Sequence, residues 1–314
     1  MSYDTVNKAL QYCNGTIWQN LSTSAIPAGC GTTSGTITTP QDVAITVPAG
    51  CVLTVKVWGG GGGGGGGSGT LACAQGGNGG GGGFAEIVEV VPATTVFYLS
   101  VASGGQGGTY RYNQQTMGGD PGSGVSAGGS SFAGGKGGYS GLAASGHGGP
   151  FSGGSGGGGG GASTVWSGSF GGNLIVAAGG GGGGGGASDG YGGYQCQNAV
   201  IDGDPGFAGG LGTSNVSTNG GTGLSGNSSG GAGGGGGGGY ATGGIGGATT
   251  QDGGGGGSNY AVSPGSTAAG SGQTPGNTSD ANYPGSNAGV GGNGSDVAGD
   301  IPTDGYSGAI YYSF

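Results

Sequence analysis

Cys51-Val-Leu-Thr-Val-Lys-Val-Trp58 runs directly into nine consecutive glycines, Gly59 to Gly67. The stretch before the glycines alternates with a period of two and is rich in valine, which is the pattern of a β-strand. The glycine run has no side chains with which to fill a core. The same junction recurs where Asn173-Leu-Ile-Val-Ala-Ala178 meets Gly179 to Gly186. The fold therefore depends on how strands continue into glycine.

Glycine makes up 101 of the 314 residues, with further blocks at 79–83, 156–161, 233–239 and 253–257. Such a composition is typical of disordered segments. Collagen is disfavoured, because it needs glycine at every third place and abundant proline, whereas this chain has 11 prolines and no strict repeat. The sequence instead favours a bundle of extended, left-handed polyglycine-II helices, whose backbone groups bond to neighbouring helices. At about 3.1 Å per residue the longest runs span about 22–28 Å, so their lengths match.

The remaining pattern predicts an all-β and irregular protein with almost no α-helix. The predicted strands alternate with a period of two or carry β-branched residues, and together they form one antiparallel β-sandwich. The predicted strands are 36–38, 43–47, 52–58, 84–91, 96–101, 173–178 and 307–314.

Adjacency along the chain predicts the organisation. We expect an N-terminal hairpin or attachment module at 1–35, and sandwich strands with a first glycine excursion at 36–101. Residues 102–305 form the polyglycine-II bundle with its loops and a strand near 173–178, and residues 306–314 form the closing strand. The chain leaves the sandwich through each glycine run and turns at the far end, for example at 109–117 and 187–204.

The N-terminal stretch Tyr12-Cys-Asn-Gly-Thr-Ile-Trp18 predicts a hairpin, because Asn-Gly favours a type I′ turn. It is either a small cap or an attachment module. The five cysteines are widely spaced and include no C-x-x-C pair, so a zinc site is disfavoured. One or two disulfides are compatible with an oxidising environment, with Cys13 and Cys30 the nearest pair. Buried free thiols are an equal alternative.

Charge and hydropathy restrict the classes of partner. The chain has four Lys and Arg against 13 Asp and Glu, a net charge of −9, and no basic patch for nucleic acid. No apolar run approaches the roughly 20 residues of a membrane span, so we expect no membrane insertion. The first residues lack the basic and apolar segments of a signal peptide.

No catalytic or metal motif stands out, and we expect no enzyme activity, no cofactor and no metal. His147 is the one histidine, and no acidic residue or cysteine lies near it in the sequence. Asp202 and Asp204, or Asp296, Asp300 and Asp304, offer oxygen ligands for calcium but match no calcium-loop spacing. The glycine runs lack the Gly-Lys-Ser/Thr ending of a phosphate-binding loop.

In a glycine bundle the informative residues are the exceptions. Tyrosine combined with Ser, Gly and Asn is typical of adaptable binding loops. Single aromatics are more simply explained as covers of the bundle, and Trp166 and Phe170, just before a predicted strand, favour packing. Two predicted far-end turns carry the candidate receptor contacts, which are Tyr110, Arg111, Tyr112, Asn113, Gln114, Tyr191, Tyr194, Gln195 and Asn198.

Val47-Pro-Ala-Gly50 leading to Val55-Lys-Val-Trp-Gly-Gly60 resembles the glycine-rich domain of phage tail proteins. Leu174-Ile-Val-Ala-Ala-Gly-Gly-Gly and Gly308-Ala-Ile-Tyr-Tyr312 are similar to later landmarks of that domain, and the resemblance covers nearly the whole chain. Related tail-fibre-tip adhesins hold stacked polyglycine-II helices whose distal loops select the host receptor. This chain departs from them in carrying its own strand-rich part and the Tyr-Cys-Asn-Gly-Thr module.

The resemblance implies a receptor-binding adhesin of a virion tail or fibre tip. Its partners would be a bacterial surface protein or glycan and other virion fibre or tail proteins, and it would act as one copy or as a homo-oligomer (trimer or filament). The alternative is a structural subunit of a virion fibre or extracellular filament, assembled through glycine-rich packing, in a virion or at a cell surface.

Overall fold

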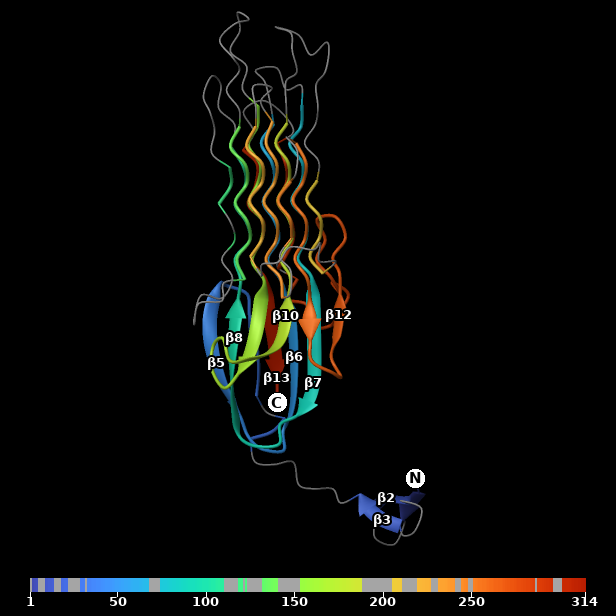
Figure 1. Cartoon of the computed structure of the whole chain (residues 1–314). Coiled ribbons are helices and arrows are strands. Elements are labelled where there is room, and N and C mark those ends of the chain that lie inside the picture. Colours follow the sequence, from blue (N-terminus) through green and yellow to red (C-terminus); the bar gives the residue numbers. More distant parts are fainter. Residues whose placement is uncertain are drawn as a thin grey trace, which may run out of the picture.

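The computed structural model describes strands and extended segments, and no helix occurs in the part of the chain that it describes (Figure 1). The described residues are 2–4, 9–13, 18–21, 29–31, 33–67, 74–109, 118–120, 122, 132–140, 153–187, 205–210, 219–226, 231–240, 244–247, 251–285, 287–295 and 301–314.

Two five-stranded antiparallel sheets pack face to face as a sandwich. The first sheet has the order β11-β10-β9-β8-β5, and the second has the order β12-β7-β6-β13-β4. In chain order the strands are β4 (Ser34–Ile37), β5 (Gln41–Val47), β6 (Val52–Trp58), β7 (Phe84–Val90), β8 (Thr95–Val101), β9 (Ser163–Ser167), β10 (Asn173–Ala178), β11 (Tyr260–Ala261), β12 (Ser266–Ala268) and β13 (Ala309–Ser313).

The sandwich core comes from the alternation seen in the sequence. In β6, Leu53, Val55 and Val57 are fully buried, while Thr54 and Lys56 between them lie on the other face of the sheet. The opposite sheet contributes Leu99 and Val165, which are also fully buried, to the same cluster. The prediction of an all-β, antiparallel sandwich is therefore confirmed.

A separate three-stranded sheet lies at the N-terminus, formed by β1 (Ser2–Asp4), β2 (Ala9–Cys13) and β3 (Trp18–Leu21). β2 and β3 are antiparallel, as the hairpin prediction requires. Their register pairs Cys13 with Trp18 and leaves residues 14–17 between the two strands. The Asn-Gly turn itself lies outside the described residues, so its type stays a prediction.

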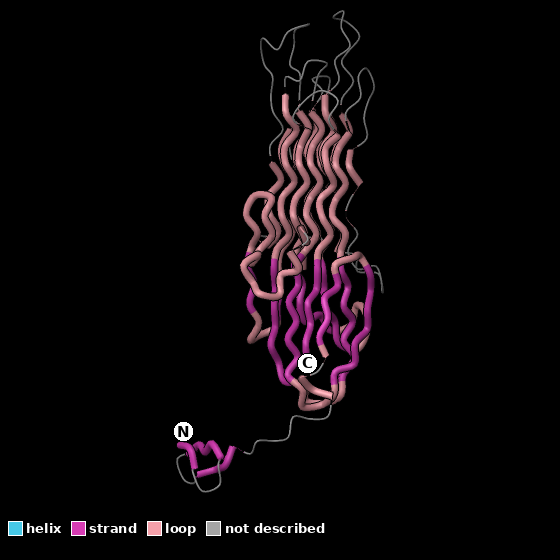
Figure 2. The backbone as a smooth tube through the Cα atoms, turned by 180° about the vertical axis from the view of Figure 1, so that it is seen from behind, coloured by secondary structure: helices cyan, strands magenta, loops and turns pink. Residues whose placement is uncertain are grey.

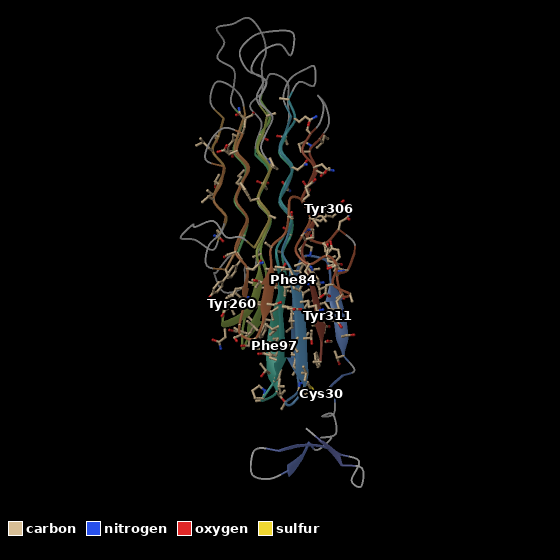
Figure 3. All side chains as sticks on the ribbon, turned by 90° about the vertical axis from the view of Figure 1, so that its right-hand side faces the viewer. Cys30, Phe84, Phe97, Tyr260, Tyr306 and Tyr311 are labelled. Carbon is tan, nitrogen blue, oxygen red and sulfur yellow. A yellow bond between two sulfur atoms is a disulfide. The ribbon has the colours of Figure 1, made fainter. Side chains whose placement is uncertain are left out.

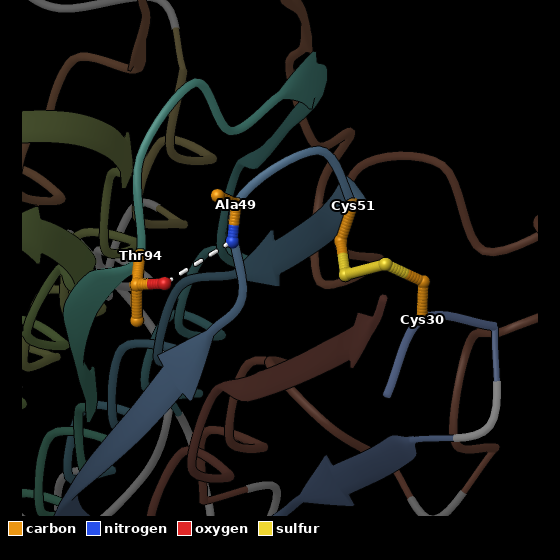
Figure 4. Close-up of a disulfide and its surroundings, with 4 residues drawn as sticks. All are labelled: Cys30, Ala49, Cys51 and Thr94. Carbon is orange, nitrogen blue, oxygen red and sulfur yellow. Dashed lines mark hydrogen bonds between the residues drawn. A yellow bond between two sulfur atoms is a disulfide. The ribbon is translucent and has the colours of Figure 1, made fainter. Parts of the chain in front are cut away.

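The disulfide differs from the Cys13–Cys30 pairing, which joins the nearest cysteines in the sequence. Cys30 bonds to Cys51 with their Cα atoms 5.2 Å apart, and not to Cys13 (Figure 4). Both sulfur-bearing residues are buried at the edge of the sandwich core. Beside them, the Ala49 N–H donates to Thr94 Oγ1 at 3.3 Å and fastens the turn that precedes Cys51. The sandwich brings Cys30 to Cys51, although Cys13 is nearer in sequence.

The glycine-rich parts of the chain form extended segments, which we call glycine rods. They lie side by side and continue the strands of the sandwich in the same direction (Figure 2). β6, β8 and β10 each end where a rod begins, and β7, β9 and β13 each begin where a rod ends. The glycine rods are 59–67, 74–83, 102–109, 118–120 with 122, 132–140, 153–162, 179–187, 205–210, 219–226, 231–239, 244–247, 251–258, 287–295 and 301–308.

Rod 59–67 donates hydrogen bonds to three neighbouring rods in rotation. Each third N–H returns to the same neighbour, and the acceptors on that neighbour descend in number, so these three neighbours are antiparallel. The bonds are Gly59 to Gly83 (3.0 Å), Gly60 to Gly161 (3.0 Å), Gly61 to Tyr306 (2.9 Å), Gly62 to Gly80 (2.8 Å), Gly63 to Gly158 (2.8 Å), Gly64 to Thr303 (3.0 Å), Gly65 to Gly77 (2.8 Å) and Gly66 to Ser155 (2.8 Å).

The carbonyl groups of the same rod accept from three other rods, again with a period of three. Here the donors ascend in number, so these three neighbours are parallel. The bonds run from Gly181 to Gly60, Gly105 to Gly61, Gly292 to Gly62, Gly184 to Gly63, Gly108 to Gly64, Ser295 to Gly65 and Ala187 to Gly66, all at 2.8–3.1 Å. Rod 59–67 is thus enclosed by other rods, and the N–H groups of Gly59–Gly66 and the C=O groups of Gly60–Gly66 are paired as burial demands.

Four rods lie inside this array, and we call them the central rods: 59–67, 153–162, 179–187 and 231–239. Every residue in them is buried. They also carry the longest unbroken glycine runs of the chain. Contact between backbones explains this, because a Cβ on Gly63, for example, would fall on the carbonyl oxygen of Gln106. The interior of the array therefore tolerates almost nothing but glycine.

The outer rods carry side chains at every third residue. In rod 132–140, Ala133, Lys136 and Tyr139 are half-buried at the surface, and the glycines between them are buried. Ser103, Gln106 and Thr109 repeat in the same way on rod 102–109, half-buried or exposed. Figure 3 shows the result, with side chains crowded on the sandwich and sparse on the rods.

Candidate functional site

The candidate receptor contacts proposed from sequence fall outside the residues that the structure describes. This holds for all nine of them, which are Tyr110, Arg111, Tyr112, Asn113, Gln114, Tyr191, Tyr194, Gln195 and Asn198. What the structure does show is the position of the rods from which both stretches begin.

Thr109 and Ala187 end their rods beside the same two central rods. The Thr109 carbonyl accepts from the Ser155 N–H at 3.2 Å, and the Ala187 N–H donates to Gly66 O at 2.9 Å. Gly66 in turn donates to Ser155 O at 2.8 Å. Since rod 59–67 leaves the sandwich at Gly59, this cluster lies at the end of the array remote from the sandwich. The residues after Thr109 and after Ala187 therefore begin from neighbouring positions at one end.

A small polar and aromatic cluster lies on the outer rods. Lys136 Nζ is 3.3 Å from Asp120 Oδ1 and 5.2 Å from the centre of the Tyr139 ring. Hydrogen bonds with Tyr139 and Asp120 raise the pKa of Lys136 above its ordinary value, so the lysine stays charged at neutral pH. The cluster is open to solvent and offers a cation, a carboxylate and a phenol to a partner.

The aromatics of the sandwich have packing roles. Trp58 lies 5.1 Å from Phe84 and 5.5 Å from Tyr283, measured between ring centroids. Trp166 lies within β9, before β10, and packs against Phe132, so its predicted packing role is confirmed. Phe170 packs against Tyr98 at 4.9 Å, and Tyr240 stacks on Tyr260 at 3.9 Å.

One side of the rod array is hollowed into a groove of about 650 Å³. We call it the side groove. Its walls come from rods 205–210, 244–247 and 251–258 and from the turn at 270–272. Phe207 and Ile245 lie along it and are 61% and 46% exposed.

Sequence reasoning did not identify the side groove. The available signal was that Phe207 and Ile245 are large apolar residues placed singly among glycines. Such residues have no side-chain partners along their own rods, so they mark a surface. Their meeting across a groove depends on which rods are neighbours.

In the described part of the chain, no group of three or more His, Cys, Asp and Glu side chains comes together to hold a metal ion. Within the same residues, no helix is long and apolar enough to cross a membrane.

Comparison with known proteins adds no family. No protein-family model matches the chain, and no curated protein matches it.

Proposed function

We propose that the chain is a receptor-binding adhesin in which a β-sandwich base carries a bundle of polyglycine-II helices. Residues at the far end of the bundle would contact a bacterial surface protein or glycan. The three-residue rotation of hydrogen bonds around rod 59–67 supports the polyglycine-II assignment. A helix of three residues per turn points successive N–H groups about 120° apart, and neighbours then surround it on all sides.

Such a bundle is suited to holding a binding surface away from its base. Rod 59–67 would span about 28 Å at about 3.1 Å per residue. Its backbone groups bond to rods on every side, so bending one rod would break bonds to several others. We infer that the bundle acts as a stiff spacer.

The observation that carries the proposal is the convergence of Thr109 and Ala187 on the same pair of central rods. The two stretches rich in tyrosine and amide side chains, at 110–117 and 188–204, start from these two residues. A binding surface built from both stretches would combine large aromatic contacts with adaptable hydrogen bonding. The fibre or tail of a virion is the proposed setting, with attachment through the N-terminal sheet.

The test is replacement of 110–117 and 188–204 by Gly-Ser segments of equal length. The fluorescently labelled protein is added to a panel of bacterial strains, and bound fluorescence per cell is measured. We expect the wild type to bind a subset of the strains. On those strains, the bound fluorescence per cell of the double replacement should be at least tenfold lower. The thermal midpoint should stay unchanged, because the rods and sandwich are intact.

A matched control is Ala93→Ser, which changes an exposed residue in the turn between β7 and β8 at the sandwich end. It should bind cells like the wild type. Unchanged cell binding by the double replacement would contradict the proposal. If that variant instead fails to assemble with virion components, the alternative of a structural fibre subunit replaces the adhesin.

A further inference from the structure

Rod 251–258 lies at the edge of the array, and two of its glycines have no backbone hydrogen-bond partner among the described residues. Gly254 donates to Gly183 at 2.8 Å and Gly255 donates to Ile245 at 2.7 Å. Their carbonyl groups accept from Phe207 and Gly237. Gly253 and Gly256 neither donate nor accept a backbone hydrogen bond within the described part of the chain. They are three residues apart, so their two N–H groups point in one direction and their two C=O groups point in another.

Both directions lie on the side of rod 251–258 that has no described rod against it. The rotation seen in rod 59–67 alternates donor and acceptor neighbours around a rod. Around rod 251–258 the described neighbours are 179–187, 231–239, 244–247 and 205–210. The interval without a rod therefore lies between 244–247 and 205–210. These two rods form the walls of the side groove, and Gly253 is among its lining residues, whereas Gly256 is buried and is not.

Unpaired backbone groups in this position are unfavourable. Gly256 is buried, yet its N–H and C=O have no partner in the described residues. A buried amide or carbonyl without a hydrogen bond is unfavourable, because it has lost its bonds to water and gained none in return. A ligand that offers an acceptor to these N–H groups at every third residue would recover part of this free energy.

We propose that the side groove binds an extended, glycine-rich peptide segment of a partner chain, which joins the array as an additional rod. The mode is analogous to the addition of a strand to an exposed sheet edge, where main-chain hydrogen bonds provide affinity. A peptide with the conformation of the rods repeats its N–H and C=O groups about every 9 Å, which is three residues at about 3.1 Å. Gly253 and Gly256 present their groups with that same three-residue repeat.

The groove also specifies the side chains of its ligand. Contact between rod backbones leaves no space for a Cβ, as at Gly254, where a Cβ would fall on Gly235 O. The ligand residues that face the rods must therefore be glycine. Phe207 and Ile245 would cover the outer side of the ligand with apolar contacts. Asp252 is the one charged residue among those that line the groove, so an anionic ligand has no counter-charge there.

The test uses a synthetic oligoglycine peptide with a lysine at each end as the probe and the full chain as the receptor. Binding is measured by microscale thermophoresis. We expect saturable binding of the oligoglycine and no binding of the same peptide with every glycine N-methylated, because N-methylation removes each N–H donor. A linear maltodextrin serves as the carbohydrate probe and should not compete.

Two variants locate the site, and neither alters a buried residue. Ser271→Trp fills the groove from its exposed rim, and Phe207→Ala removes an exposed wall. Each should weaken oligoglycine binding at least tenfold with an unchanged thermal midpoint. Leu224→Ala is the matched control, since Leu224 is 51% exposed on an outer rod that does not line the groove, and it should leave binding unchanged.

Absence of oligoglycine binding, equal binding of the N-methylated peptide, or equal affinity of Ser271→Trp would each overturn the proposal. Competition by maltodextrin would also overturn it and assign the groove to a glycan. The proposal does not rest on the adhesin function. The variant with both far-end segments replaced should bind oligoglycine like the wild type.

Discussion

Trp58 shows at the scale of one residue how the sandwich is joined to the rods. It is the last residue of β6, its side chain is fully buried, and its indole Nε1–H donates to Gly276 O at 3.0 Å. Phe84, the first residue of β7, pairs with it across the sheet. Together these rings close the sandwich core at the level where the chain becomes glycine.

On the glycine side of that junction, the absence of a side chain matters as much as the buried ring of Trp58 does in the sandwich. We predict that Gly63→Val lowers the free energy of unfolding by about 3 kcal/mol, because its Cβ would overlap Gln106 O in a packed interior. Urea unfolding followed by tryptophan fluorescence measures the change. Gln106→Ala is the control, because the Gln106 side chain is exposed while its backbone makes the contact with Gly63. Its free energy of unfolding should stay within about 0.5 kcal/mol of the wild type. Equal stability of Gly63→Val and the wild type would show that rod 59–67 is not packed as described.

A second residue-scale prediction concerns pH. Asp280 forms an ion pair with Lys56 at 2.7 Å and accepts from the Asn282 N–H at 2.8 Å. Burial opposes ionisation of Asp280, but the hydrogen bonds from Lys56 and Asn282 outweigh burial and hold its pKa below the ordinary value. A carboxyl with a lowered pKa in the folded state stabilises the fold above its unfolded pKa of about 3.9. That contribution is lost as the pH falls through the folded pKa.

We therefore expect Asp280→Asn to lower the free energy of unfolding by about 2 kcal/mol at pH 7, the scale of a hydrogen bond to a charged group. The difference from the wild type should shrink as the pH falls below about 4. Urea unfolding at pH 7, 4 and 3 measures it. Asp120→Asn is the control, because the Asp120 side chain is 62% exposed and its ion pair should contribute less than about 1 kcal/mol. A difference that is constant with pH would contradict the assignment.

At the scale of elements, the repeat of three decides where a side chain can be placed. In rod 132–140, Lys136 occupies an outward position and Gly135 a buried one, where a Cβ would fall on Gly221 O. Moving the lysine by one residue turns it into the array. Moving it by three residues, to position 133, keeps it outside.

The prediction compares two double variants of nearly equal composition. Gly135→Lys with Lys136→Gly should lose about 3 kcal/mol or more, because it buries a long charged side chain in a packed interior. Ala133→Lys with Lys136→Ala should remain within about 1 kcal/mol of the wild type. Thermal unfolding by calorimetry ranks the two. Equal destabilisation by both moves would exclude the three-residue repeat.

Much of the element pattern could be predicted because it is local. The strands that became β5 and β6 alternate clearly, and each predicted strand overlaps an observed one. β9, β11 and β12 were not predicted. Ser163-Thr-Val-Trp-Ser167 has little apolar content, and the other two strands contain only two and three residues. These short strands depend on pairing with neighbours distant in sequence.

Long-range order explains the other differences. Cys30 meets Cys51 because the sandwich folds them together, whereas sequence distance favours Cys13. The side groove depends on the order of rods in the array, and a single glycine run contains no information about its neighbours. The far-end contacts at 110–114 and 191–198 stay predictions, since they lie outside the described residues.

At the scale of the whole molecule, the account divides the chain into a sandwich that needs side chains and a rod array that excludes them. The sandwich is stabilised mainly by burial of aliphatic and aromatic residues. The array is stabilised by backbone hydrogen bonds between neighbouring rods. The proposed binding functions use the two kinds of boundary that such an array has, its far end and its open side.

The central claim is that the glycine runs form an ordered, hydrogen-bonded interior. Hydrogen–deuterium exchange, read by mass spectrometry on proteolytic fragments that contain Gly59–Gly67 and Gly179–Gly186, tests it most directly. The account predicts that the amides of these runs exchange as slowly as those of β6 and β7, because all of them except Gly67, Gly179 and Gly185 donate to a neighbouring rod. Exchange at the rate of an unfolded chain in the glycine runs, with β6 and β7 still protected, would contradict it.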